Sequence, residues 1–155
     1  MPYRRSLRRF SKQSWEDFNE EVCRAHNEHL MEGIVAGCAL VAYADGWVTE
    51  DEHRRMLALL RGFEPISVFG LDDVTLTFEA LTEQFVADQT RGEAAALAAV
   101  ARLKGTKRYP ALLVEACCAI ADADGGFDAE ERAVAIRICN VLGLDPVDFE
   151  LMAAP

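Results

Sequence analysis

The sequence contains an internal repeat, and this feature limits the possible folds more than any other. The motif AYADGWVTEDE at residues 42–52 returns at residues 121–131 as ADADGGFDAEE. An offset of 79 residues also aligns flanking positions, among them Val35 with Val114, Cys38 with Cys117 and Asp45 with Asp124. Each copy runs from a long apolar stretch through an Asp-Gly pair to a helix-start signal. The chain is therefore predicted to contain one helix–turn–helix unit twice, at about residues 30–64 and 109–143.

The helix-start signal in each copy is a capping box. Thr49 with Glu52, and Asp128 with Glu131, have the spacing that this motif requires. The first side chain accepts a hydrogen bond from an early backbone N–H of the helix, and the carboxylate three residues later accepts one from the cap residue. The second helix of each copy therefore has a well-defined predicted start.

Apolar residues at helical spacing predict about seven helices and no strand. The predicted helices cover residues 14–29, 30–45, 49–63, 72–86, 92–103, 110–124 and 128–142. Asp72 is the predicted N-cap of the fourth helix, and Thr90 with Glu93 forms the predicted capping box of the fifth. The helices at 30–45 and 110–124 are apolar on nearly all sides, as expected of helices surrounded by protein. We therefore expect an all-α fold, a single compact helical domain over residues 14–155 whose two apolar helices pack across a pseudo-twofold axis.

The composition predicts a cytoplasmic protein with one hydrophobic core. With 155 residues, of which 51% are hydrophobic, the chain is long enough for a single well-packed domain. The longest apolar run, residues 34–44, is too short to cross a bilayer.

The net charge limits the possible partners. A formal charge of −10 argues against general nucleic-acid binding, because phosphate contacts need a cationic face. Residues 1–13 differ from the rest as a basic N-terminal tail without acids, carrying Arg4, Arg5, Arg8, Arg9 and Lys12. Such a tail suits peripheral contact with the inner face of an anionic membrane, and a solvated tail is the alternative.

The cysteines and histidines do not predict a catalytic or transition-metal site. The five cysteines form no C-x-x-C pair and mostly have apolar neighbours, which is typical of reduced, buried thiols. Cys117 and Cys118 lie within an apolar helix without nearby cations, so we expect them to be unreactive. His26 and His29 are too few to hold a transition metal. No nucleophile motif or nucleotide-binding loop occurs, so an enzyme is not expected.

The acidic residues near the two turns are the candidate ligands for a divalent cation, either Ca²⁺ or Mg²⁺. Hard cations prefer carboxylate oxygens, and a joint site would take them from both copies. The candidates are Asp45 and Glu52 in the first copy and Asp122, Asp124, Asp128 and Glu131 in the second. The second turn is not an EF-hand, because its glycine comes too early and no bidentate glutamate follows at position 12. An acidic docking patch and a solvated surface with ordinary Asp-Gly turns are the alternatives.

Four segments of the chain resemble the TerB tellurite-resistance protein family. They are LMEGIVAGCALVAYADG (30–46), VFGLDDVTLTFEALTEQF (68–85), GEAAALAAVARLK (92–104) and AIADADGGFDAEERAVAIRICNVLGLDPVDFEL (119–151). The last segment is the most specific, because D-G-x-F-x-x-E-E, a buried helix and LGLDP occur together. Tyr43 and Trp47 in the first copy replace Asp122 and Gly126 of the second, so the two halves of a site would differ.

The resemblance implies an α-helical domain from a bacterial tellurite- and stress-resistance operon, acting within a complex rather than as a catalyst. It also implies a membrane-linked, metal-associated assembly in which a TerC-like integral membrane protein is the partner and TerD-type proteins bind calcium. We therefore expect a non-catalytic, acidic helical interaction module that binds a divalent cation at its paired Asp-Gly turns. A metal-free acidic docking scaffold at the membrane surface is the second interpretation, and an enzyme of unknown reaction is the third.

Overall fold

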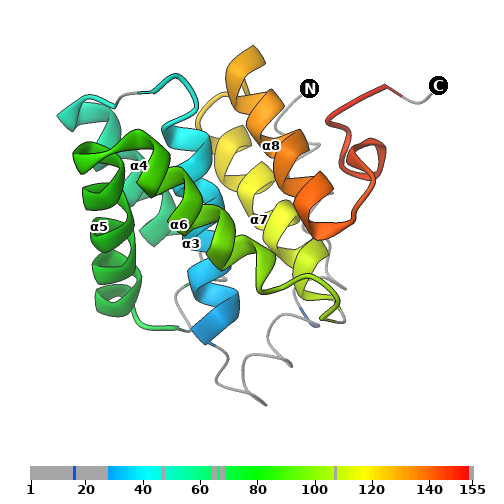
Figure 1. Cartoon of the computed structure of the whole chain (residues 1–155), viewed down its shortest axis with the longest axis horizontal. Helices are drawn as coiled ribbons and strands as arrows, with labels where there is room; N and C mark the ends of the chain where they lie inside the picture. The colour runs from blue at the N-terminus through cyan, green and yellow to red at the C-terminus, as the bar shows by residue number, and fades with distance from the viewer. Residues whose placement is uncertain are drawn as a thin grey trace.

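The computed structural model describes residue 16 and residues 28–46, 48–63, 66, 69–106 and 108–153. This part of the chain is all-helical and forms one compact domain, as predicted (Figure 1). The elements are α3 (Glu28–Ala42), α4 (Glu50–Gly62), α5 (Leu71–Ala87), α6 (Gln89–Ala101), α7 (Tyr109–Ala123), α8 (Ala129–Leu142) and the 3-10 helix η2 (Pro146–Phe149). The predicted basic tail and most of the predicted helix at 14–29 lie outside the described residues, which therefore contain six α-helices rather than seven.

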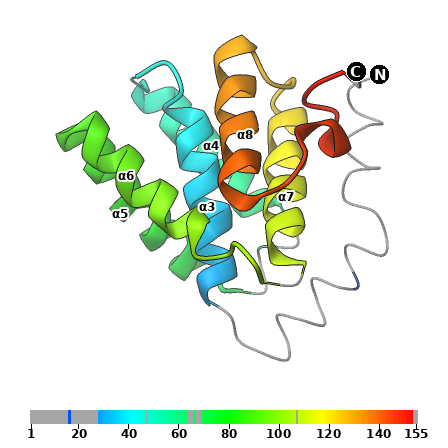
Figure 2. The same cartoon turned by 45° about the vertical axis from the view of Figure 1, so that its right-hand side comes forward.

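The two repeat copies are the helix pairs α3–α4 and α7–α8, each joined by an Asp-Gly turn. Both predicted capping boxes are present at the starts of α4 and α8. The backbone N–H of Glu52 donates to Thr49 Oγ1 at 3.1 Å, and the N–H of Thr49 donates to Glu52 Oε2 at 3.0 Å. The corresponding distances in the second copy, between Asp128 and Glu131, are 2.7 and 3.0 Å. Both turns lie at the same end of the bundle (Figures 1 and 2).

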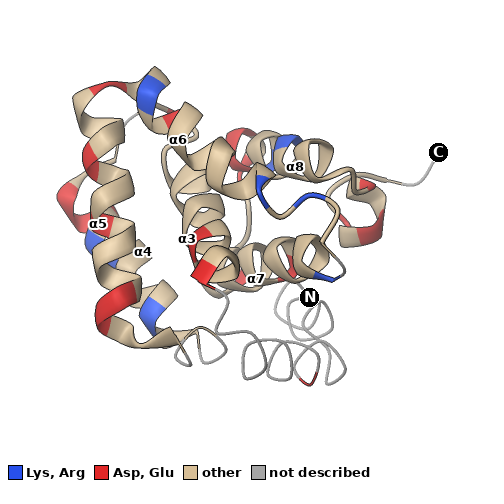
Figure 3. Ribbon diagram, turned by 60° about the horizontal axis from the view of Figure 1, so that its bottom comes forward, with Lys and Arg blue, Asp and Glu red and all other residues tan. Residues whose placement is uncertain are grey.

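α3 is the central helix and contacts all five other α-helices. Leu30, Ile34 and Val35 are fully buried, in agreement with the apolar sequence of this helix. α7 crosses α3 closely, since a Cβ atom added at Gly37 would lie 2.8 Å from the Sγ atom of Cys117. Like α3, α7 contains no lysine or arginine and only two acidic residues (Figure 3). The two apolar helices therefore bury each other, as the repeat predicts.

The hairpin of α5 and α6 packs on one side of α3 (Figure 2). Its two helix starts differ from the prediction. α5 starts at Leu71 after Gly70, whose φ of 90° ends the preceding connection, so Asp72 lies inside the first turn instead of capping it. The N-cap of α6 is Asp88, which accepts hydrogen bonds from the N–H groups of Thr90 and Arg91, so the predicted Thr90–Glu93 capping box is wrong. Aspartate caps a helix as well as threonine does, and the earlier of the two candidates is used here.

Candidate cation-binding pocket

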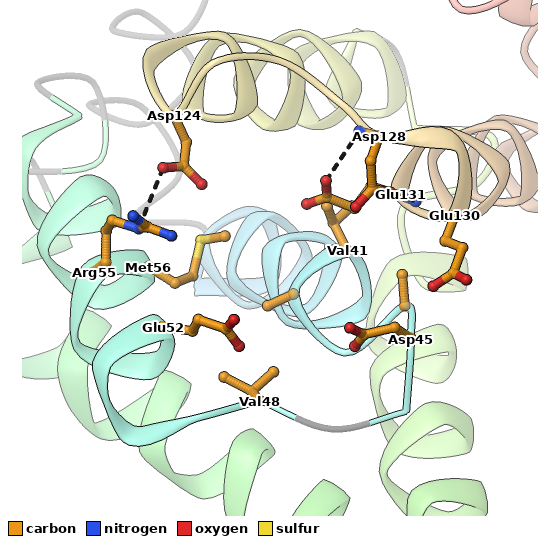
Figure 4. A pocket seen from close by; sticks show the side chains of 12 residues that line it. Val41, Asp45, Val48, Glu52, Arg55, Met56, Asp124, Asp128, Glu130 and Glu131 are labelled. Atoms are coloured by element: carbon orange, nitrogen blue, oxygen red, sulfur yellow. Dashed lines mark hydrogen bonds and ion pairs between the residues drawn. The ribbon is translucent and has the colours of Figure 1, made fainter.

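The two Asp-Gly turns form one acidic pocket. The α3–α4 turn brings Asp45 and Glu52 to it, and the α7–α8 turn brings Asp124, Asp128 and Glu131. The space between the turns has a volume of about 190 Å³. Figure 4 shows carboxylates from both turns facing this space. Residues 79 positions apart in the chain, Asp45 and Asp124, thus line the same pocket.

Five of the six predicted ligands line the pocket and the sixth, Asp122, does not. Residues two positions apart on a helix face different directions, so Asp122 and Asp124 cannot both face the pocket from the end of α7. The sequence analysis missed two polar residues that do line it, Glu130 and Arg55. Glu130 could have been found, because it lies next to Glu131 in the first turn of α8. Arg55 could not, because its place depends on how α4 packs against α7.

Arg55 brings a positive charge into the pocket and links the two copies. Its Nε atom lies 3.4 Å from Asp124 Oδ1, so α4 of the first copy is paired with the turn of the second (Figure 4). The side chains of Arg55 and Asp124 are 64% and 33% exposed, so solvent screens this ion pair. In the second copy, the residue that corresponds to Arg55 is the uncharged Val134. The two copies therefore contribute different charges to the pocket.

Glu131 is the carboxylate whose protonation the pocket changes. Burial is the largest cause that raises the pKa of Glu131, and the negative charges of Asp128 and Asp124 raise it further. The hydrogen bond from the backbone N–H of Asp128 opposes this by favouring the charged form. A cation bound next to Glu131 would favour the charged form of this side chain over the protonated form. Binding would therefore release a proton from each molecule in which Glu131 is protonated.

The carboxylates have a donor set that fits a hard cation, although three of them also hold the helix starts. Glu52, Asp128 and Glu131 each accept a backbone hydrogen bond of a capping box, and the carboxyl groups of Asp128 and Glu131 also interact with each other. Ca²⁺ takes six to eight oxygen ligands, which in proteins include waters and backbone carbonyls. In the described conformation no three His, Cys, Asp or Glu side chains stand close enough to hold one ion. Binding would therefore require rotation of the pocket side chains toward the centre.

The described cysteines have structural roles. Cys38, Cys117, Cys118 and Cys139 are buried thiols, whereas Cys23 and His26 lie outside the described residues. The hydrogen bond with Cys38, and then burial, raise the pKa of the Cys117 thiol well above its ordinary value, and burial chiefly raises the pKa of Cys139 to about 12. Since the thiolate is the reactive form, both thiols are suited to packing and not to chemistry. His53 lies 3.1 Å from Glu79, outside the pocket.

Comparison with known proteins gives the family. The family model described as tellurite resistance protein TerB matches residues 31–154, which include both turns and the whole pocket. The chain belongs to the TerB family. It is also similar to a tellurium resistance protein TerB from an Alcaligenes species, with 32% identity over 89 residues that cover 57% of this chain and 73% of that protein. No solved structure matches. These relationships make this TerB-family chain a tellurite-resistance-associated protein. Among the helices of the described part, none combines the length and the hydrophobicity needed to cross a membrane.

Proposed function

We propose that this protein is a non-catalytic component of a bacterial tellurite- and stress-resistance complex, and that its acidic pocket binds a divalent cation. The observation that carries the proposal is the meeting of the two turns: Asp45, Glu52, Asp124, Asp128 and Glu131 line one pocket although they come from separate copies. With Glu130, the described lining of the pocket has six carboxylates and one arginine. Burial, and then the negative charges of Asp128 and Asp124, raise the pKa of Glu131, and a cation between the turns would offset both effects.

The oxygen-only donor set favours Ca²⁺ or Mg²⁺ over a transition metal. The described lining residues include no histidine or cysteine, the ligands that Zn²⁺ prefers. They also include no serine, histidine or cysteine that could act as a nucleophile or a general base. This composition supports a binding role for the pocket instead of a catalytic one.

A metal-free docking function is the second candidate, and Arg55 favours it. The pair between Arg55 and Asp124 gives an example of a guanidinium bound by a pocket carboxylate. A basic loop of a partner could bind the remaining carboxylates in the same way. The partner expected from the family resemblance is a TerC-like membrane protein, with Arg4, Arg5, Arg8, Arg9 and Lys12 contacting the membrane surface.

The test is an NMR titration of the full chain with Ca²⁺, Mg²⁺ and Zn²⁺, following the backbone amides of residues 45–49 and 124–128. Saturable shifts in both turns at one ion per chain are expected for Ca²⁺ or Mg²⁺, and weaker binding for Zn²⁺. The Asp45→Asn/Asp124→Asn variant is expected to lose this binding. The matched control is Asp72→Asn/Asp73→Asn, which removes the same charge from the first turn of α5, outside the pocket.

Each outcome separates the two functions. Loss of binding in the pocket variant alone supports the joint cation site. Equal weakening in both variants would mean that only the overall charge attracts the ion, and the cation site would be rejected. Absence of shifts at millimolar ion would also reject it and leave the docking function, which would then be tested with peptides from the cytoplasmic loops of a TerC-like protein.

A further inference from the structure

Helix α5 presents an acidic face to solvent. Of the amphipathic helices α4, α5, α6 and α8, only α5 contains no lysine or arginine. It carries Asp72, Asp73, Glu79 and Glu83, all of which are exposed (Figure 3). Glu79 contacts His53 of α4, whereas the other three make no ion pair with any residue that the structure describes. The outer face of α5 thus has negative charge that the described part of the domain does not balance.

The same face carries apolar side chains that the domain leaves uncovered. Leu76 is 68% exposed and Val86 is 78% exposed, although the opposite side of α5 packs against α3, α4 and α6 (Figure 2). Ala80 and Ala87 are also exposed. Single apolar side chains scattered over a surface are ordinary, but a contiguous group of them marks an interaction site.

The spacing of these residues fits the packing of a second helix on α5. Leu76, Ala80, Glu83 and Ala87 follow one another at steps of four, three and four residues, so they form one stripe along the helix, the α5 stripe. Side chains at such steps make the line of contact between two packed helices. The small side chains of Ala80 and Ala87 leave room for large apolar side chains of the other helix. Leu76 supplies a large side chain in return.

The acidic residues determine which charge the second helix must carry. At helical spacing, Asp72 and Glu79 lie on one side of the α5 stripe, Asp73 lies on the other side, and Glu83 lies within it. A helix that packs here must bring lysine or arginine next to these carboxylates, since like charges on neighbouring helices repel each other. The same face would repel an anionic membrane, a nucleic acid or a second copy of α5.

We propose that the outer face of α5 is a docking surface for a basic amphipathic helix of a partner protein. The apolar side chains of the α5 stripe supply the contact area, and the carboxylates give the specificity for a cationic partner. This surface is separate from the acidic pocket, because α5 contributes none of the described residues that line the pocket. Docking on α5 and cation binding in the pocket are therefore independent, and either proposal can fail without the other.

The first test is an NMR titration of the full chain with a synthetic helical peptide that has one leucine stripe flanked by lysines. Saturable shifts are expected for the backbone amides of residues 72–87, with little change at residues 45–49 and 124–128. Shifts confined to the two turns would show that the peptide binds the acidic pocket instead. Absence of binding, or equal binding of a peptide with the same residues in scrambled order, would also overturn the proposal.

Substitutions on α5 separate the apolar contribution from the charged one. Leu76→Asn leaves the charge unchanged and is expected to weaken binding of the lysine peptide about tenfold, because it removes the large apolar side chain of the α5 stripe. Asp72→Asn/Glu83→Gln is expected to weaken binding several-fold. The matched control is Glu50→Gln/Asp148→Asn, which removes the same charge from exposed positions of α4 and η2. Unchanged binding in Leu76→Asn, or equal weakening in the two double variants, would contradict the proposal.

The second test identifies the natural occupant of the surface. A photo-crosslinking amino acid is placed at position 80 of the full chain in the native cell, and mass spectrometry gives the sequence of the attached segment. The expected segment belongs to another protein and has apolar residues at helical spacing with an excess of lysine and arginine. The same amino acid at position 148 is the control for chance contacts. An acidic segment, a segment of this same chain, or no segment beyond those found at position 148 would overturn the proposal.

Discussion

The close crossing of α3 and α7 can be tested with a Gly37→Ala substitution. The new Cβ would lie 2.8 Å from the Sγ atom of Cys117 and 3.3 Å from the Cδ2 atom of Leu113. Cβ atoms in proteins essentially never approach a sulfur atom as closely as the first distance. Because Cys117 is only 6% exposed and lies in the packed core, it has little room to move away.

Two effects of opposite sign determine how much Gly37→Ala changes the free energy of unfolding. Replacing glycine by alanine inside a helix stabilises it by about 1 kcal/mol, whereas overpacking a well-filled core costs about 1–3 kcal/mol. With contacts on two side chains at once, the overpacking cost is expected to be the larger. The expected net loss in the free energy of unfolding is therefore up to about 2 kcal/mol.

Urea denaturation measures this loss as a lower transition midpoint at an unchanged m-value. Gly62→Ala is the control, because nothing lies within 4 Å of the Cβ added there, and it is expected to be neutral or stabilising. Cys117→Ala removes the clashing sulfur, so the Gly37→Ala/Cys117→Ala variant is expected to lose clearly less than the sum of the two single variants. If Gly37→Ala is as stable as Gly62→Ala, or if the losses add, the proposed close contact of α3 and α7 is wrong.

Three further predictions concern the pocket and the helix starts. Glu131→Gln keeps the oxygen that accepts the capping hydrogen bond but removes the negative charge. The pKa of Glu131 is raised in the folded state, so the protonated side chain stabilises the folded wild type at acid pH. The wild type loses this stability as the pH rises through the folded-state pKa. The variant is therefore expected to gain a few tenths of a kcal/mol over the wild type near neutral pH in pH-dependent urea denaturation, and a gain at acid pH instead would contradict the sign. Arg55→Ala frees Asp124 from its ion pair, so tighter Ca²⁺ or Mg²⁺ binding is expected by calorimetry, and weaker binding would show that Arg55 organises the pocket instead. Asp88→Ala removes the N-cap of α6 and is expected to cost about 1 kcal/mol, with Thr90→Ala as a nearly neutral control; a larger loss in Thr90→Ala would restore the rejected capping box.

The prediction from sequence was accurate where neighbouring residues decide the structure. The capping boxes at Thr49 and Asp128 were predicted correctly, because each depends on hydrogen bonds between residues three apart. Gly143, which follows the last apolar residue of α8, ends that helix with a φ of 75°. The N-cap of α6 was predicted two residues too late, at Thr90 instead of Asp88, because both residues have capping side chains and the sequence does not rank them.

The pocket was predicted in part because the repeat reveals that two similar turns exist. The sequence does not reveal which side chains of each turn face the other copy. That depends on the crossing of α3 and α7, and it excludes Asp122 and brings in Arg55. Glu130 differs from these two residues, because its place beside Glu131 in the first turn of α8 can be read from the sequence.

The sequence by itself determined the helical class, the duplicated helix–turn–helix unit and the residues that start its helices. Periodicity and capping act over a few residues, so a linear sequence contains them in full. Only the tertiary structure decided that Asp45 and Asp124 share one pocket, that Arg55 pairs across the copies, and that α6 packs against both α3 and α8. These arrangements depend on the packing of helices far apart in the chain, where the close approach at Gly37 sets how the two copies lie against each other.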